Sequence, residues 1–393
     1  MSAVSPVFSI FPIIIALFTT FLLSKFFRVG LSHHSRFKSI DGLRGYLALF
    51  VFLHHSMIWF FYLKLGRWQL PPSNLYINFG KIGVALFFII TGFLFSFKLL
   101  DARKNQKSIN WSLLFFSRVF RLVPLYFVVI LILSLIVLVL THFALVSSMS
   151  VFTHTLLYWF GFTVFGHPDI NGVFGTWIIM AGVAWSLPYE WFYYFSLPLF
   201  GLFIGLRVPV LCVLISVASV YLFYVLKFEA VHLYYFLVGI LSAFFVGNRM
   251  IKTLATHKIS DYVLAILLLV SFLSSELKGG KVSLIIFFIF FVAITNGNTL
   301  FGILTNKISI FLGEMGYSLY LLHGIILFTV FKFVFGFSAA SSFSPLGYWV
   351  IVSICASILV VCSFATYTWI EAPAMRCVKY FSNSVRSRVQ LNI

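Results

Sequence analysis

One apolar stretch of the sequence carries side chains that could transfer a proton. It opens with Asp41-Gly-Leu-Arg44-Gly and contains His54 and His55. In a helix, Arg44 and His55 are eleven residues apart, almost three turns, and project from the same face. His54 then points about 100° away, which favours a structural role. A neutral imidazole is a general base, and Asp41 and Arg44 would fix the orientation and charge of His55. A buried histidine bonded to a neighbouring helix is the alternative interpretation of His55.

A second motif pairs two cations. Arg118 and Arg121 lie one turn apart on a predicted helix, so their guanidinium groups form a fork that suits a phosphate or a diphosphate. Charge placed at a helix end by membrane topology alone is the alternative interpretation. Four preceding basic residues would strengthen the positive field, namely Lys98, Arg103, Lys104 and Lys107.

A third motif sets a carboxylate among aromatic rings. Glu190 follows Trp185 and Tyr189 and precedes further aromatic residues. Aromatic rings stack on sugar rings, and a carboxylate accepts hydrogen bonds from hydroxyl groups. The motif therefore predicts a carbohydrate-binding surface formed by Glu190, Trp185 and Tyr189. An aromatic belt at the membrane interface, with a structural ion pair, is the alternative interpretation.

Two further motifs lie toward the C-terminal end. Tyr317, Tyr320 and His323 recur at every third position, and Tyr317 and His323 are candidate substrate contacts. Helix packing is the alternative interpretation of His323. Glu371, just before Pro373, is expected to pair with cytoplasmic arginines in an architectural role. Small residues that would admit a second helix at close range are Gly313, Gly316 and Ser318.

Composition places these groups in a membrane. Of 393 residues, 62% are hydrophobic and 9% charged, whereas soluble domains are roughly 45–50% apolar and about 25% charged. This composition excludes a soluble globular protein, and the length of the apolar runs predicts helices rather than a barrel. We therefore predict an all-α, polytopic helical bundle. Its eleven expected spans lie near residues 7–27, 41–63, 82–100, 122–142, 185–206, 208–226, 231–247, 260–275, 282–297, 310–331 and 347–370. Residues 143–184 are expected to form a re-entrant or interfacial segment.

The formal net charge of +18 is distributed unevenly between the two predicted sides. The side richer in Lys and Arg should be cytoplasmic, which places the C-terminus inside and the N-terminus and residues 143–184 outside. The positive excess is therefore assigned to contact with membrane lipid, and no nucleic-acid-binding module is found. The first span lacks the basic start of a signal peptide and is expected to be retained. The four cysteines lack metal-binding spacing, and no metal site is predicted.

Taken in order, the motifs resemble the membrane-bound acyltransferase-3 family, the integral O-acyltransferases of bacterial surface polysaccharides and related glycans. Three departures accompany the resemblance: Thr91 stands where the family usually has Ser, an additional helix precedes the core, and no esterase-like domain follows the last helix. The matching motifs are Asp41-Gly-Leu-Arg44-Gly with His55 after ten residues, Gly83 to Thr91-Gly92-Phe93, Arg118-x-x-Arg121 with Pro124-x-Tyr126, Trp185-Ser-Leu with Glu190, Tyr235-Phe-Leu-Val-Gly239, Gly316-Tyr-Ser-Leu-Tyr320-Leu-Leu-His323, and Ile370-Glu371-x-Pro373.

The resemblance implies ten core transmembrane helices within residues 39–375. One extra N-terminal helix and a basic loop, residues 1–38, precede this domain, and a basic cytoplasmic tail, residues 376–393, follows it. The implied donor is cytoplasmic acyl-CoA, with acetyl-CoA the commonest. The implied acceptor is a hydroxyl of a polysaccharide, a lipopolysaccharide O-antigen or a related glycan at the bacterial inner membrane.

The resemblance also assigns roles to individual residues. His55 would be the catalytic base or a transient acyl carrier, with Arg44 and Asp41 as its companions. Arg118 and Arg121 would contact the CoA phosphates. Separate glycan-assembly proteins are possible partners, because any transfer must be completed in the membrane domain or by a second protein.

Two other classes of function stay open at this point. A transporter or flippase for a lipid-linked anionic glycan would use the same arginines for binding and the intramembrane histidines for proton coupling. An assembly subunit of a glycan-synthesis complex would need neither Arg44 nor His55 for its role.

Overall fold

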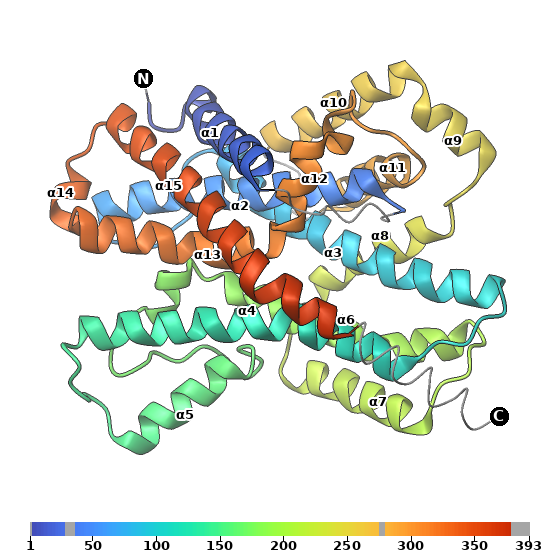
Figure 1. Ribbon diagram of the computed structural model, residues 1–393, viewed down its shortest axis with the longest axis horizontal. Coiled ribbons are helices and arrows are strands. Elements are labelled where there is room, and N and C mark those ends of the chain that lie inside the picture. The colour runs from blue at the N-terminus through green and yellow to red at the C-terminus, as the bar shows by residue number, and fades with distance from the viewer. Residues whose placement is uncertain (1, 28–35, 275–279, 379–393) are drawn as a thin grey trace. The chain divides into compact units, whose positions relative to one another are not determined.

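A computed structural model describes residues 2–27, 36–274 and 280–378, and over these ranges the chain is helical without any strand. Figure 1 shows the course of the helices along the chain. Their bounds are α1 Pro6–Phe26, α2 Lys38–Leu65, α3 Asn74–Lys104, α4 Trp111–Leu140, α5 Met149–Phe160, α6 Ser186–Phe203, α7 Val210–Val225, α8 Leu233–Ala243, α9 Arg249–Thr256, α10 Lys258–Leu273, α11 Lys281–Thr295, α12 Lys307–Glu314, α13 Gly316–Thr329, α14 Phe337–Ser341 and α15 Pro345–Thr366.

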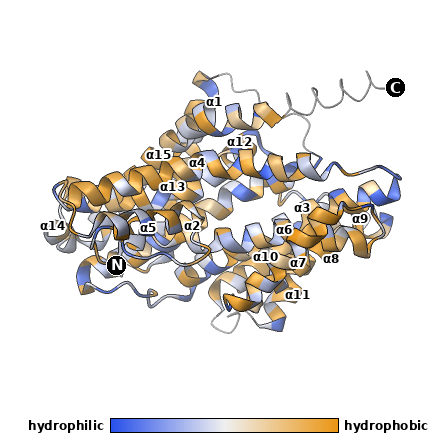
Figure 2. Cartoon of the chain, turned by 90° about the horizontal axis from the view of Figure 1, so that it is seen from below, coloured by the Kyte–Doolittle hydropathy of each residue, from blue (hydrophilic) through white to orange (hydrophobic). Residues whose placement is uncertain are grey.

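The helices confirm an all-α, polytopic membrane protein. In the described ranges, six helical segments are long and apolar enough to cross a membrane, and the bent pair α9 and α10, with an angle of 77° between them, makes up to seven. Further apolar helices of 10–17 residues include α7 and α11. Hydrophobic residues run along most of the helices in Figure 2, as expected where lipid rather than water surrounds them. The six segments are Pro6–Phe26, Lys38–Leu65, Asn74–Lys104, Trp111–Leu140, Gly316–Val334 and Pro345–Val378.

Each of the eleven expected spans coincides with helical residues, but some bounds differ. The run 310–331 is not one helix, because the chain breaks at Met315 between α12 and α13. Helices α3 and α4 begin eight or more residues before the expected spans, since the preceding residues are helical too although they include the charged Lys81 in α3 and Arg118 and Arg121 in α4. In the segment 143–184 the helix α5 has 12 residues. Its length of about 18 Å is too short to cross a core of about 30 Å.

The chain divides into two compact units, which are described separately. Unit 1 consists of Met1–Phe97, Met180–Val183 and Glu229–Cys362, and unit 2 consists of Lys98–Ile179, Ala184–Phe228 and Ser363–Ile393.

Unit 1 is built around α2, and glycines let other helices approach it. A Cβ on Gly313 would overlap the carbonyl oxygen of Asp41, and a Cβ on Gly42 would overlap that of Leu304. A Cβ on Gly45 would lie 2.9 Å from the backbone nitrogen of Gly313. Small residues therefore bring α12 against the first turns of α2, as the sequence predicted for Gly313.

The extra N-terminal helix packs within unit 1. The indole nitrogen of Trp349 on α15 donates to the carbonyl oxygen of Ala3 over 2.9 Å, and the Thr19 and Ser357 hydroxyls lie 3.0 Å apart. Helix α1 is thus anchored to α15 at two levels.

A short piece of the expected re-entrant region also belongs to unit 1. A Cβ on Gly324 of α13 would overlap the backbone of Met180. The Tyr320 hydroxyl donates to the carbonyl oxygen of Val183 over 3.1 Å. Residues 180–183 are therefore held against α13 by close backbone contact and a hydrogen bond.

Candidate active site

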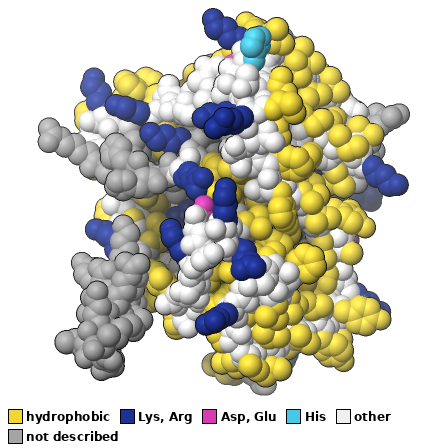
Figure 3. Space-filling view, turned by 90° about the vertical axis from the view of Figure 1, so that its right-hand side faces the viewer, with side chains coloured by type: hydrophobic (Ala, Val, Ile, Leu, Met, Phe, Trp, Pro, Cys, Tyr) yellow, Lys and Arg dark blue, Asp and Glu magenta, His cyan; other side chains and the backbone are white. Residues whose placement is uncertain are grey.

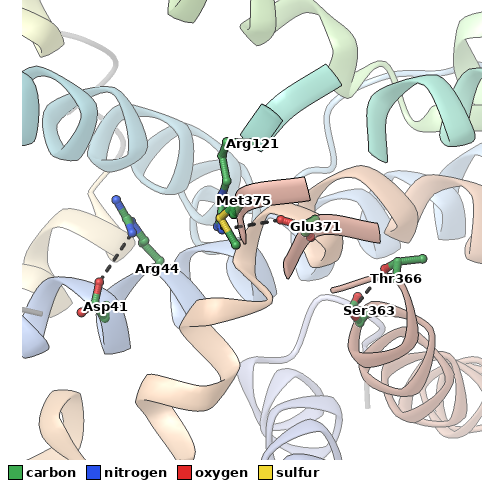
Figure 4. A network of polar contacts seen from close by, with 7 residues as sticks. All are labelled: Asp41, Arg44, Arg121, Ser363, Thr366, Glu371 and Met375. Atoms are coloured by element: carbon green, nitrogen blue, oxygen red, sulfur yellow. Dashed lines mark hydrogen bonds and ion pairs between the residues drawn. The ribbon is translucent and has the colours of Figure 1, made fainter. Parts of the chain in front are cut away.

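His55 lies within the continuous 28-residue helix α2. Because no break separates Arg44 from His55, the two residues keep the helical phase that the sequence predicted. At 1.5 Å per residue they are separated by about 16 Å along the axis. Near the start of the helix, Arg44 Nη1 lies 3.5 Å from Asp41 Oδ1, as Figure 4 shows. Asp41 and Arg44, which the sequence grouped together, therefore form an ion pair.

His55 makes a direct contact with the second candidate histidine. The Nδ1 atom of His55 lies 3.0 Å from Nε2 of His323 on α13. It also lies 3.1 Å from the carbonyl oxygen of Val51 on its own helix. In turn, Nδ1 of His323 lies 3.2 Å from the carbonyl oxygen of Leu319. Two histidines that are 268 residues apart in sequence therefore form one hydrogen-bonded pair.

The carbonyl partners assign the protons in this pair. A carbonyl oxygen only accepts, so Nδ1 of His323 donates to Leu319 and its Nε2 is an acceptor. Nδ1 of His55 then carries the proton that is shared between His323 and Val51. The remaining nitrogen of His55, Nε2, is unprotonated and is the basic atom of the pair.

The surroundings of the two rings differ. The His323 ring is fully buried, whereas His55 is partly exposed. The Trp68 ring stacks on His55 with 6.4 Å between centroids and also contacts Trp59 at 5.5 Å. Sequence reasoning missed Trp68, which follows the end of α2. A lone Trp between two apolar runs was the signal that could have drawn attention to it.

His54 points elsewhere, as its helical phase predicted. Its Nδ1 lies 2.7 Å from the carbonyl oxygen of Tyr76 on α3, and a Cβ on Gly80 would lie 2.5 Å from its ring. His54 therefore joins α2 to α3 and faces a different neighbour from His55.

Helices α13 and α2 run in the same direction where they pack together. A Cβ on Gly316 would lie 3.5 Å from Cβ of Arg44. About two turns further along α13 and about three turns further along α2, His323 meets His55. Tyr317 is half-buried in the first turn of α13. Tyr320 lies between Tyr317 and His323 in sequence, and the centroid of its ring lies 6.2 Å from that of His323.

In unit 2, the two arginines of α4 have different partners. Arg121 Nη1 lies 3.8 Å from Oε2 of the buried Glu371 and 3.0 Å from the sulfur of Met375, as Figure 4 shows. A π-helical turn over Tyr367–Glu371 shifts the register of the chain at this point. Glu371 therefore pairs with an arginine, as the sequence predicted, and that arginine is Arg121.

Arg118 lies beside the aromatic motif of α6. Its guanidinium carbon lies 5.9 Å from the centre of the Tyr194 ring, and the Tyr194 hydroxyl donates to Oε1 of Glu190. The Trp185 ring is exposed, while Tyr189 is buried and packs on other aromatic rings. Of the three predicted sugar contacts, Tyr189 therefore occupies a core position.

The described ranges contain no group of three His, Cys, Asp or Glu side chains arranged to hold a metal ion. The chemistry that this geometry supports is proton transfer or nucleophilic attack by a neutral imidazole. A second histidine orients that imidazole from a buried position.

Comparison with known protein families finds a match over most of the chain. A family model described as an acyltransferase domain matches residues 37–368, which is most of the 393-residue chain. The matched range includes Arg44, His55, Arg118 and His323. Comparisons with curated proteins and with solved structures find no match. The chain therefore belongs to the acyltransferase-3 family and is a membrane acyltransferase.

Proposed function

We propose that this acyltransferase moves an acetyl group from acetyl-CoA, approached from the cytoplasm, to a hydroxyl of a surface polysaccharide or related glycan. The observation that carries the proposal is the pair of His55 and His323, which leaves Nε2 of His55 as a base within a membrane helix. Ionisable groups at this depth are expensive and serve function by default.

In the direct reaction, Nε2 of His55 takes the proton of the acceptor hydroxyl. The hydroxyl oxygen forms a bond to the acetyl carbon, the carbon–sulfur bond breaks, and the CoA thiolate receives the proton. In the stepwise reaction, Nε2 attacks the thioester carbon, the carbon–sulfur bond breaks and the CoA thiolate leaves. The hydroxyl oxygen then bonds to the acetyl carbon, the bond from that carbon to Nε2 breaks, and the hydroxyl proton passes to the CoA thiolate. Both routes need an oriented, unprotonated Nε2, which the hydrogen bond to His323 supplies.

The remaining predicted residues have supporting roles in the proposal. Arg44 and Asp41 would set the electrostatic field below His55, and Trp185 with Glu190 would contact the glycan. Arg118 would act on the donor side. The alternation of basic residues supports a cytoplasmic C-terminus and an external N-terminus. The membrane in this proposal is the bacterial inner membrane, which the family resemblance implies.

The experiment measures transfer of labelled acetyl groups from acetyl-CoA to the native glycan in membranes. We expect His55→Ala to lower the rate by about 100- to 10,000-fold, the usual contribution of a general base. His54→Gln is the matched control, because the amide can still donate to Tyr76, and it should retain most activity. Mass spectrometry should show one acetyl group per modified sugar only with active protein.

Two results would overturn the proposal. The first is transfer at the wild-type rate by His55→Ala. The second is movement of an unmodified lipid-linked sugar across the membrane without acyl transfer, which would identify a transporter.

A further inference from the structure

A pocket of about 620 Å³ lies within unit 2. It is lined by residues within 102–111, which comprise the end of α3, the connection to α4 and the first residue of α4, and by residues 205–209, which connect α6 to α7. Its volume is in the range of small-molecule sites, roughly 300–1,000 Å³, and a single phosphate would fill only a small part of it.

Three cations line this pocket, namely Arg103, Lys107 and Arg207. Among the described residues that line it there is no Asp or Glu. On the face shown in Figure 3, Lys and Arg side chains outnumber Asp and Glu side chains. The pocket is therefore positively charged and suits a ligand with several negative charges.

Contacts within unit 2 hold the two connections together. The indole nitrogen of the buried Trp111 donates to the carbonyl oxygen of Arg207 over 3.1 Å. Gly205 has φ of +77°, and a Cβ there would lie 3.5 Å from Nη2 of Arg103. Asn110 caps α4 by accepting from the backbone nitrogen of Leu113 over 2.9 Å. These contacts fix the positions of the segments at the helix ends that carry the three cations.

We propose that this pocket binds the phosphorylated nucleotide end of the acyl-CoA donor, and its ligand assignment rests on the proposed function. A polyanion cannot enter lipid, so its phosphates must be held at helix ends, where this pocket lies. Arg121 is compensated by Glu371, whereas the pocket offers three cations without a lining carboxylate.

The shared chemistry is recognition of phosphate groups, which an anionic lipid headgroup could also supply. Binding of adenosine 3′,5′-bisphosphate to the purified full-length protein is therefore measured in nanodiscs of neutral lipid and in nanodiscs with anionic lipid. We expect binding in both, and we expect Arg103→Ala, Lys107→Ala and Arg207→Ala each to weaken it about tenfold through a lost charge-assisted hydrogen bond. Lys252→Ala, an exposed charge on α9 outside the pocket, is the control.

Kinetics supply a second readout. The three pocket variants should raise KM for acetyl-CoA about tenfold while kcat stays near wild type. The lost contacts would stabilise the bound donor and the transition state equally, so their loss weakens binding without slowing the chemical step. With a donor that lacks the 3′-phosphate, the difference between wild type and these variants should shrink.

The outcomes separate this inference from the proposed function. Acetyl transfer that depends on His55, with no bisphosphate binding and no KM change in the pocket variants, would overturn the inference alone. Pocket variants that lose only a response to anionic lipid would assign the pocket to a lipid headgroup, which also overturns it. Bisphosphate binding that depends on the pocket would stand even if His55 proved dispensable, since that measurement involves no acyl transfer.

Discussion

Replacement of His323 by alanine tests whether the two histidines act as one unit. The change removes the acceptor 3.0 Å from Nδ1 of His55 and leaves only the Val51 carbonyl oxygen as its neighbour. When His55 takes a proton in the transition state, its bond to His323 becomes charge-assisted and is worth about 1.5–3 kcal/mol. Since about 1.4 kcal/mol is a factor of ten in rate, kcat should fall by about 10- to 150-fold. KM should change little, because the bond strengthens only as the proton moves.

Loss of packing must be separated from loss of this bond. His323 is fully buried, so alanine also leaves a cavity. Leu327→Ala is the matched control, because Leu327 is equally buried one turn further along α13 and has no polar group. His323→Gln offers an amide oxygen as acceptor and should restore part of kcat.

The assay is the initial rate of acetyl transfer in proteoliposomes, normalised to the folded fraction measured by size-exclusion chromatography. Thermal unfolding in detergent reports the stability of each variant. The reasoning would be refuted if His323→Ala kept the wild-type kcat per folded molecule. It would also be refuted if Leu327→Ala lost as much kcat as His323→Ala, since the effect would then be packing alone.

Three further variants test other contacts. Gly313→Ala should lower the unfolding temperature sharply, because the methyl group overlaps the Asp41 carbonyl and overpacking costs about 1–3 kcal/mol or more; an unchanged unfolding temperature would contradict the close packing of α12 on α2. Glu371→Ala should destabilise the protein by about 3–5 kcal/mol, because the side chains of Glu371 and Arg121 are 0% and 20% exposed and the change leaves the Arg121 charge unpaired. Replacing both residues with apolar ones should recover much of this loss in the same unfolding assay. Arg44→Ala should change the free energy of unfolding by less than about 1 kcal/mol, because the side chains of Arg44 and Asp41 are 29% and 20% exposed. It should nevertheless lower the rate of acetyl transfer per folded molecule. If the rate falls only as much as the amount of folded protein, the ion pair has a structural role alone.

The helical phase of α2 was readable from sequence because it depends on nearby residues alone. Arg44 and His55 share one face, and His54 points to another neighbour, as their spacing predicted. The contact of His55 with His323 was not readable in this way. Both were candidates, but their spacing of 268 residues carries no information about which helices meet.

Burial separated residues that the sequence had grouped. Trp185, Tyr189 and Glu190 formed one predicted surface, yet Tyr189 lies in the core because it packs on Phe228. Arg118 and Arg121 formed one predicted fork, yet Arg121 pairs with Glu371 from the end of the chain. In both cases, partners from distant segments decided the environment of each side chain.

Hydropathy and charge were sufficient to predict a helical membrane protein, because helix formation in lipid depends on runs of about 20 neighbouring residues. The acyltransferase activity was indicated by the resemblance of the ordered motifs to a known family. Packing decided the rest. The contact of α2 with α12 depends on backbone approach at Gly45 and Gly313, and the orientation of His55 depends on the α13 side chain beside it. Such contacts join segments hundreds of residues apart, so the folded chain had to bring them together before the basic nitrogen of His55 could be assigned.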